Sequence, residues 1–307
     1  MKNVIFSLLF FLTVNVAGKE IIVKIDVAID HLEQLHQRIL QAPDTSKIRL
    51  NEEFKQSLNE LLHDVRSLTY DLSALKSVSV LTAPRNKFRI YTWPLEISPG
   101  NYDYFGFTQY LLNKKSRKIK VVELENAVFN LTHEMDKSYE PTQWRGGLYY
   151  SLIPSKKKNS KNFLLLGWDG HNKRSTKKMI EVISFTKKGN PVFGAPILNF
   201  EAKAVKKNFR VKQPKEVTYQ VKYRHEFEYS SKVSMMLRYD KGMKMVVYDH
   251  LTPMNPKLIS VKATYVPDYS YDGLYLKKGK WYMKSNLDLR NGTLPKAKKY
   301  KSSDVKQ

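Results

Sequence analysis

Residues whose types could do chemistry gather in one short segment, Leu164-Leu-Leu-Gly-Trp-Asp-Gly-His-Asn172. Here Trp168 offers a flat face for stacking, while Asp169, His171 and Asn172 offer polar groups to a ligand such as a sugar. The same residues also suit a hairpin turn, in which Asp169 and Asn172 bond the local backbone and Gly170 takes a left-handed conformation. We favour the turn, and retain Asp169 and His171 as catalytic candidates and Trp168 and Asn172 as ligand-binding candidates.

Further acidic residues follow in the strongly basic part of the chain, where acids are scarce. Two carboxyl groups about 5 to 9 Å apart would fit glycoside hydrolysis. Each of these acids also lies beside a glycine, a proline or an aromatic residue in a plausible turn, where capping of the backbone explains it. The further catalytic candidates are Asp249, His250, Asp268 and Asp272, and the further ligand-binding candidates are Trp93, Tyr269 and Tyr271.

Several common catalytic signatures are absent from the sequence. There is no G-x-S-x-G elbow, and the nearest approach to a P-loop, Gly273 to Lys280, has the wrong spacing and is followed by Trp281. Two His-Glu pairs resemble the start of a zinc helix, but each lacks the second histidine four residues after the first. The chain has no cysteine, which excludes a thiol nucleophile, a thiolate metal site and disulfides. We therefore expect no metal and no cofactor.

The elements that would position these residues begin with a helical region, expected over residues 19–75. A second helix is predicted to start near Asn51, whose side chain can cap free amides. Before it, Pro43-Asp-Thr-Ser46 breaks the helical pattern. Both segments carry apolar residues at steps of three and four, which predicts an antiparallel hairpin that buries one face. Its apolar positions are Ile29, Leu32, Leu35, Ile39, Leu40, Phe54, Leu58, Leu61, Leu62, Val65, Leu68 and Leu72.

After Leu75 the apolar period changes from about 3.6 to 2, as in Phe88-Arg-Ile-Tyr-Thr-Trp93. Glycine turns separate the strand-like runs at Lys187-Lys-Gly-Asn190, Asp240-Lys-Gly242 and Lys277-Lys-Gly279. The predicted fold is mainly β, and α+β overall. It has the helical hairpin followed, over residues 76–293, by a large antiparallel β meander that forms a sandwich or barrel-like domain. Most of the many aromatic side chains are expected in its core.

The two ends of the chain predict an exported protein. Residues 1–18 have a basic start at Lys2, an apolar run from Val4 to Val14 and small residues before Lys19, which is typical of a signal peptide. No membrane span is expected after cleavage. Without cysteines, an exported chain fits a bacterial envelope, and we predict a periplasmic or secreted protein of a Gram-negative bacterium. Residues 294–307 are rich in lysine and predict a flexible tail.

The net charge of +24 is concentrated after Arg85, since residues 19–85 hold nine basic and ten acidic residues. The lysines cluster at 114–120, 156–161, 173–178 and 203–215. Each cluster could contact an anionic polymer, and each could equally be a solvated surface that keeps a β protein soluble. For an exported protein the natural polyanions are anionic glycans and lipid headgroups. Nucleic acid is an unlikely partner.

A set of short strings gives the β region a resemblance to a known family. The chain resembles, over roughly Thr82 to Asn291, a family of exported proteins of unknown function from Bacteroidota-type bacteria. That resemblance implies export and brings no activity or catalytic residue with it. The strings are Phe88-Arg-Ile-Tyr-Thr-Trp93, Gly147-Leu-Tyr-Tyr150, Leu165-Leu-Gly-Trp-Asp-Gly170, Thr176-Lys-Lys178, Pro191-Val-Phe-Gly-Ala-Pro196, Tyr248-Asp-His250 and Pro267-Asp-Tyr-Ser-Tyr-Asp-Gly273.

These observations lead to three hypotheses for function. The first is a non-enzymatic binding or envelope-associated module, whose basic, aromatic-rich surface meets an anionic glycan, a lipid headgroup or an envelope protein. The second is a hydrolase acting on a glycan through the aspartates named above. The third is a structural component of an envelope complex, held by the helical hairpin. The sequence leaves the oligomeric state open.

Overall fold

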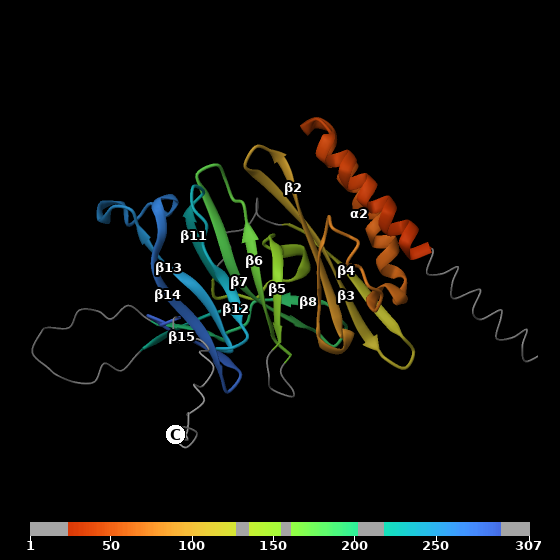
Figure 1. Cartoon of the computed structure of the whole chain (residues 1–307). Coiled ribbons are helices and arrows are strands. Elements are labelled where there is room, and N and C mark those ends of the chain that lie inside the picture. The colour runs from red at the N-terminus through yellow and green to blue at the C-terminus, as the bar shows by residue number, and fades with distance from the viewer. Residues whose placement is uncertain (1–23, 127–134, 155–160, 202–217, 290–307) are drawn as a thin grey trace, which may run out of the picture.

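The computed structural model describes residues 24–126, 135–154, 161–201 and 218–289 (Figure 1). The predicted signal peptide, the predicted lysine-rich tail and the lysine cluster at 203–215 lie outside the described residues, as does most of the cluster at 156–161. From right to left in Figure 1, a pair of helices is followed by three sheets. The predicted fold class is confirmed: a helical hairpin precedes antiparallel sheets, and the described strands form no closed barrel.

The hairpin consists of a first helix, residues 24–41, and α2, Asp44–His63, followed by the short 3-10 helix η1, Val65–Leu68. The predicted start of the second helix was wrong. Pro43 precedes α2 in an extended conformation, and a proline is tolerated there because the first helical amides need no partner within the helix. Asn51 is instead buried inside α2. In the described part of the chain, none of the helices has an apolar stretch that could cross a bilayer.

The first sheet is a plain meander in the order β1-β2-β3-β4. The second sheet has the order β11-β7-β6-β5, with β8 also paired to β7. The third sheet has the order β10-β9-β15-β14-β13-β12, in which β15 and β9 are parallel and the other neighbours antiparallel. The strands are β1 Ser79–Thr82, β2 Phe88–Ser98, β3 Asn101–Asn113, β4 Lys118–Leu124, β5 Leu148–Pro154, β6 Phe163–Asp169, β7 Ser175–Phe185, β8 Pro191–Phe193, β9 Leu198–Glu201, β10 Tyr219–Lys222, β11 His225–Ser230, β12 Leu237–Asp240, β13 Met245–Pro253, β14 Tyr265–Lys277 and β15 Lys280–Lys284.

The turns were predicted with mixed success. Gly189 and Gly279 take the expected positive φ, at 78° and 84°. At the β12–β13 turn the positive φ falls on Lys244, at 56°. The segment Pro267 to Gly273, expected as a turn, lies within β14. A proline is accepted inside this strand because the ladder with β13 is irregular there, with a register shift between Asp249 and Leu251.

Alternation along β2 explains how the layers stack. Tyr91 and Trp93 point to the helices, where they join the apolar stripe of the hairpin. Phe88 and Ile90 point to the opposite face, where they pack with residues of β6 and β7. Leu164 and Leu166 of β6 face the third sheet. Helices and sheets therefore form one series of packed layers, in which the first two sheets are covered on both faces. Of the predicted stripe, Leu40 is 61% exposed and lies outside the core.

His225 is packed where the second and third sheets meet. Its ring centroid lies 4.0 Å from that of Phe200 and 4.5 Å from that of Phe227. Burial, with a smaller contribution from the nearby Lys222 ammonium group, lowers the pKa of His225 well below its ordinary value of 6.5. The folded protein therefore holds this imidazole neutral, whereas the unfolded chain takes up a proton as the pH falls below the ordinary value.

We expect stability to decrease in acid partly through this residue, by at most about 1.4 kcal/mol per pH unit below the ordinary pKa. The fall in melting temperature between about pH 7.5 and about pH 5 should be smaller in His225→Phe than in the native protein. His31→Gln, a change at an exposed position of the first helix, serves as the control. An equal acid-induced fall in His225→Phe and the native protein would exclude the role of His225.

Candidate functional site

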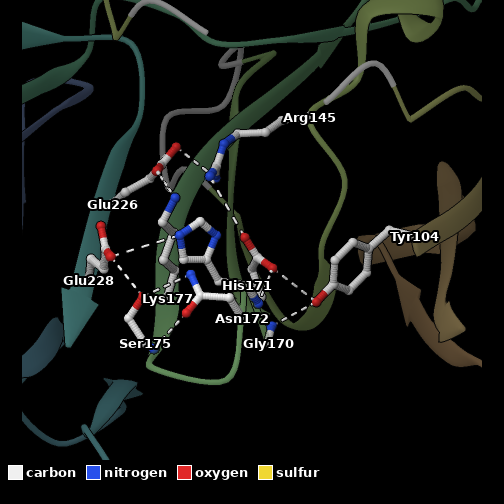
Figure 2. Close-up of polar contacts among 10 residues, drawn as sticks. Tyr104, Arg145, Gly170, His171, Asn172, Ser175, Lys177, Glu226 and Glu228 are labelled. Atoms are coloured by element: carbon white, nitrogen blue, oxygen red, sulfur yellow. Dashed lines mark hydrogen bonds and ion pairs between the residues drawn. The ribbon is translucent and has the colours of Figure 1, made fainter. Parts of the chain in front are cut away.

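The segment singled out in the sequence forms the turn between β6 and β7 (Figure 2). Asp169 ends β6, and its Oδ1 accepts hydrogen bonds from the His171 backbone amide at 2.8 Å and from the Tyr104 hydroxyl at 3.1 Å. The Tyr104 oxygen in turn accepts the Gly170 amide at 2.7 Å. Asn172 Oδ1 accepts the amide of Ser175 at 3.0 Å. This arrangement is a turn whose polar side chains bond its own backbone.

The predicted left-handed conformation of Gly170 was wrong, because His171 carries the positive φ of 55° in this turn. Glycine is required at 170 for space instead. A Cβ there would lie 2.3 Å from the ring of Tyr102 and 2.9 Å from the ring of Trp168. Trp168 packs edge-on against Tyr102 with ring centroids 5.4 Å apart. This contact between Trp168 and Tyr102 of β3 joins the turn to the first sheet.

Three charged residues that the sequence did not single out complete this cluster, as Figure 2 shows. Arg145 forms an ion pair with Glu226, at 2.6 Å between Nη1 and Oε1, and lies 3.8 Å from Asp169 Oδ2. Glu228 Oε1 accepts from the Ser175 hydroxyl at 2.7 Å and lies 3.8 Å from His171 Nε2. The only local signal was the spacing of Glu226 and Glu228, which places both on one face of β11. Their neighbours come from other strands.

The electrostatics of the cluster favour mutual pairing. Burial is the largest cause that lowers the pKa of His171, and the charge of Lys177 adds to it, so the imidazole is neutral at neutral pH. Lys177 also lies 4.0 Å from Glu226. Each carboxylate of the cluster already has a cationic or hydroxyl partner. A general acid or base must have a free position facing its substrate, so this arrangement stabilises the turn more directly than it supports catalysis.

The remaining acidic candidates lie on β13 and β14, away from that turn. Asp249 Oδ2 accepts the backbone amide of Met236 at 2.7 Å, which ties β13 to the chain before β12. Asp272 Oδ1 accepts the amide of Asn286 at 3.0 Å. Burial raises the pKa of Asp272 above its ordinary value. Both carboxylates therefore cap backbone groups, as the sequence argument favoured.

His250 and Asp268 face each other across these strands, with 2.7 Å between Nδ1 and Oδ2. Ser270 donates its hydroxyl to the other oxygen of Asp268, also at 2.7 Å. The carboxylate of Asp268 therefore lies between the Ser270 hydroxyl and the His250 imidazole. A catalytic triad needs the histidine between the other two, because the imidazole must take the serine proton. This trio therefore lacks the contact that would activate Ser270.

The aromatic candidates are placed in three different environments. Trp93 is 2% exposed and donates its indole N–H to Asn51 Oδ1 at 2.9 Å, so it belongs to the core between hairpin and sheet. Tyr271 is partly buried in a small cluster with Met245. Tyr269 is 91% exposed and has a φ of 65°. The structure thus brings Trp168, Asp169, His171 and Asn172 together, and His250 with Asp268, but not all candidates in one place.

A pocket that the sequence did not point to opens beside the core shared by the first two sheets. It has a volume of about 340 Å³ and is lined by Lys87, Phe88, Tyr110, Lys161, Phe163, Phe185, Thr186 and Lys187. Its walls are aromatic. The rings of Tyr110 and Phe185 are stacked with centroids 4.6 Å apart, and Phe88 lies 4.5 Å from Phe185 and 5.0 Å from Phe163. We call this the lysine-aromatic pocket.

Its rim is positive. The Lys87 ammonium lies 4.4 Å from the centroid of the Tyr110 ring and donates to the Leu111 carbonyl at 2.9 Å. Lys161 and Lys187 are exposed. Among the residues that the structure describes, none of these three lysines forms an ion pair, and the eight lining residues include no carboxylate. Among the described residues, the pocket therefore combines aromatic side chains with three lysines that have no carboxylate partner.

Comparison with protein families, with curated proteins and with solved structures finds no match for this chain. Among the described residues, no group of three or more histidine, aspartate or glutamate side chains is placed to hold a metal ion. In the lysine-aromatic pocket, charged and aromatic side chains line a cavity that is open to solvent.

Proposed function

We propose that this protein is a non-enzymatic binding module that holds an anionic glycan in the lysine-aromatic pocket. The observation that carries the proposal is the combination, within one pocket, of Lys87, Lys161 and Lys187 with the rings of Tyr110, Phe163 and Phe185. Aromatic faces stack against the apolar faces of sugar rings, and unpaired ammonium groups bind carboxylate or sulfate. A volume of about 340 Å³ lies at the small end of the range for ligand pockets, which suits one or two sugar units.

The location proposed for this activity is the cell envelope of a Gram-negative bacterium. The signal-like residues 1–18, the absence of cysteine and the resemblance to exported bacterial proteins support it. Envelopes are rich in acidic glycans, and a net charge of +24 attracts such polymers over a distance of several ångströms. The glycan could be free or attached to a lipid, and the same pocket chemistry serves both.

The test is binding of acidic and neutral oligosaccharides to the purified protein. A glycan array at low and near-physiological salt would identify acidic glycans that bind, and calorimetry with trigalacturonate would follow as a defined probe. We expect Lys161→Ala/Lys187→Ala to weaken binding by about 10- to 100-fold, because each ammonium contact to an anion contributes about 1 kcal/mol or more. Tyr110→Leu should weaken binding to acidic glycans by about 5- to 10-fold, because it removes one aromatic wall of the pocket.

The matched control is Lys114→Ala/Lys115→Ala. It removes the same charge from the exposed turn between β3 and β4, whose residues do not line the pocket. If both lysine pairs reduced binding equally, the interaction would be one of net charge and the pocket would not be the site. A uniform absence of binding on the array would exclude the glycan proposal altogether.

A further inference from the structure

The connection between β13 and β14, residues 254–264, carries apolar side chains that point into solvent. We call it the β13–β14 arm, and it lies at the upper left of Figure 1, at the end of the molecule away from α2. In the described chain, eleven large hydrophobic side chains are exposed, and four of them fall within eight consecutive residues of this arm. They are Met254, Leu258, Ile259 and Val261, with exposed fractions of 62%, 37%, 61% and 44%.

The backbone of the arm is ordered by its own hydrogen bonds. Met254 donates its amide to the Thr264 carbonyl at 3.0 Å, which closes the base. Asn255 Oδ1 accepts the Lys257 amide at 2.9 Å, and the Tyr265 hydroxyl donates to the Ile259 carbonyl at 2.8 Å. Polar backbone groups that are already paired cost less to remove from water. These internal hydrogen bonds lower the cost of moving the arm, with its exposed apolar side chains, into an apolar environment.

The arm itself carries positive charge and no acidic residue. Lys257 and Lys262 flank Leu258, Ile259 and Val261, and the sequence from His250 to Pro267 contains no acidic residue. The Lys262 ammonium lies 4.0 Å from the centroid of the Tyr265 ring, close to the base of the arm. Apolar side chains at a tip with lysines beside them are the pattern of segments that enter the interface of a membrane whose headgroups are anionic.

We propose that the β13–β14 arm inserts its apolar side chains into the interfacial region of an anionic lipid bilayer. A bilayer fits better than a folded partner because four exposed apolar side chains lie within eight consecutive residues at one end of the molecule, with lysines among them. The lysines and the net charge of +24 complement anionic headgroups. This surface is separate from the lysine-aromatic pocket, and the proposal stands whether or not a glycan binds there.

The experiment measures co-sedimentation of the full chain with vesicles of phosphatidylcholine alone and with roughly 30% phosphatidylglycerol, at near-physiological salt. The native protein should bind the anionic vesicles. Met254→Ser/Ile259→Ser should reduce the partition coefficient by about 10-fold or more, because two large side chains no longer leave water. Lys257→Gln/Lys262→Gln should reduce it by about fivefold per lysine on the anionic vesicles only.

Two matched variants test the specificity of the site. Val27→Ser/Leu40→Ser removes two side chains of similar exposure, 60% and 61%, from the first helix and should leave vesicle binding unchanged. Lys161→Ala/Lys187→Ala should also retain it, which separates this proposal from glycan binding. The tryptophan introduced by Ile259→Trp should be quenched by brominated lipids. Unquenched fluorescence with bound vesicles, no vesicle binding by the native protein, or full binding by Met254→Ser/Ile259→Ser would overturn the proposal.

Discussion

Replacing Arg224 with methionine should lower the free energy of unfolding by about 3 to 5 kcal/mol, as expected when one partner of a buried ion pair is removed. Arg224 is 2% exposed, and its Nε lies 2.9 Å from Oε2 of Glu181, which is 3% exposed. The guanidinium also donates to the carbonyls of Lys137 at 2.9 Å and Phe193 at 3.1 Å. One side chain therefore joins β7 and β8 to the segment at 137, and its loss leaves a buried carboxylate and two carbonyls without these donors.

The pH dependence of this variant provides an independent check. Burial is the largest influence on Glu181 and raises its pKa, and Arg224 opposes that effect. Without Arg224 the folded pKa of Glu181 should rise further, so the destabilisation relative to the native protein grows as the pH rises through the native pKa of Glu181, which already lies above its ordinary value, and shrinks below it. Denaturant unfolding of Arg224→Met at several pH values measures both effects.

The control is the double change Glu181→Met/Arg224→Met. Replacing a whole buried ion pair with apolar residues of similar volume is often neutral or stabilising, so this variant should recover most of the lost stability. If the double variant were no more stable than Arg224→Met, the bonds to the two backbone carbonyls would account for the loss, and the ion-pair argument would be wrong. An unchanged midpoint in the single variant would contradict it directly.

Trp93→Ala should destabilise the protein by about 3 to 5 kcal/mol, the usual cost of removing a buried tryptophan. The ring of Trp93 lies 5.4 Å from that of Phe54 on α2 and 5.8 Å from that of Phe105 on β3. Its loss would open a cavity between hairpin and sheet. Asn51 Oδ1 would also lose its donor, so Trp93→Phe should still cost about 1 to 3 kcal/mol despite its better packing. Thermal or denaturant unfolding measures both variants.

The matched control is Leu40→Ala on the exposed side of the first helix, which should change stability by less than about 0.5 kcal/mol. The same packing bears on the hypothesis that the hairpin is a detachable anchor. Deleting it would expose Tyr91, Trp93, Leu95 and Phe107, which share its apolar cluster. We therefore expect the truncated chain to aggregate. A soluble, cooperatively folding truncation, or a Trp93→Ala variant of native stability, would show that the sheet does not depend on the hairpin.

The periodic parts of the sequence were predictable because their signal is local. Alternation from Phe88 to Trp93 predicted a strand there, and β2 begins at Phe88 as expected. The helical stripe located α2, although the start was placed seven residues late because Asn51 looks like a cap. Its true role depends on Trp93, which follows 42 residues later. A residue that bonds a distant partner gives no local indication of it.

In the candidate sites, too, contacts between neighbours in the sequence were predictable and contacts between distant residues were not. The turn at Asp169 to Asn172 was foreseen from residue types that bond their neighbours, but Arg145, Glu226 and Glu228 reach it from other parts of the chain. The lysine-aromatic pocket was not foreseen. Its side chains come from β2, β3, β6, β7 and the residues next to them, and each of these segments reads as an ordinary strand or turn.

By itself the sequence determined the change from helices to strands after the hairpin, the fold class and the basic character of the second part of the chain. These follow from short-range periodicity, turn chemistry and composition, which every residue carries with it. Only the tertiary structure decided which residues meet: that the hairpin covers the first sheet, that Arg224 pairs with Glu181, and that three lysines lie beside aromatic walls in one pocket. Such contacts join residues far apart in the chain. They depend on how strand register and layer packing are resolved together, which no local pattern encodes.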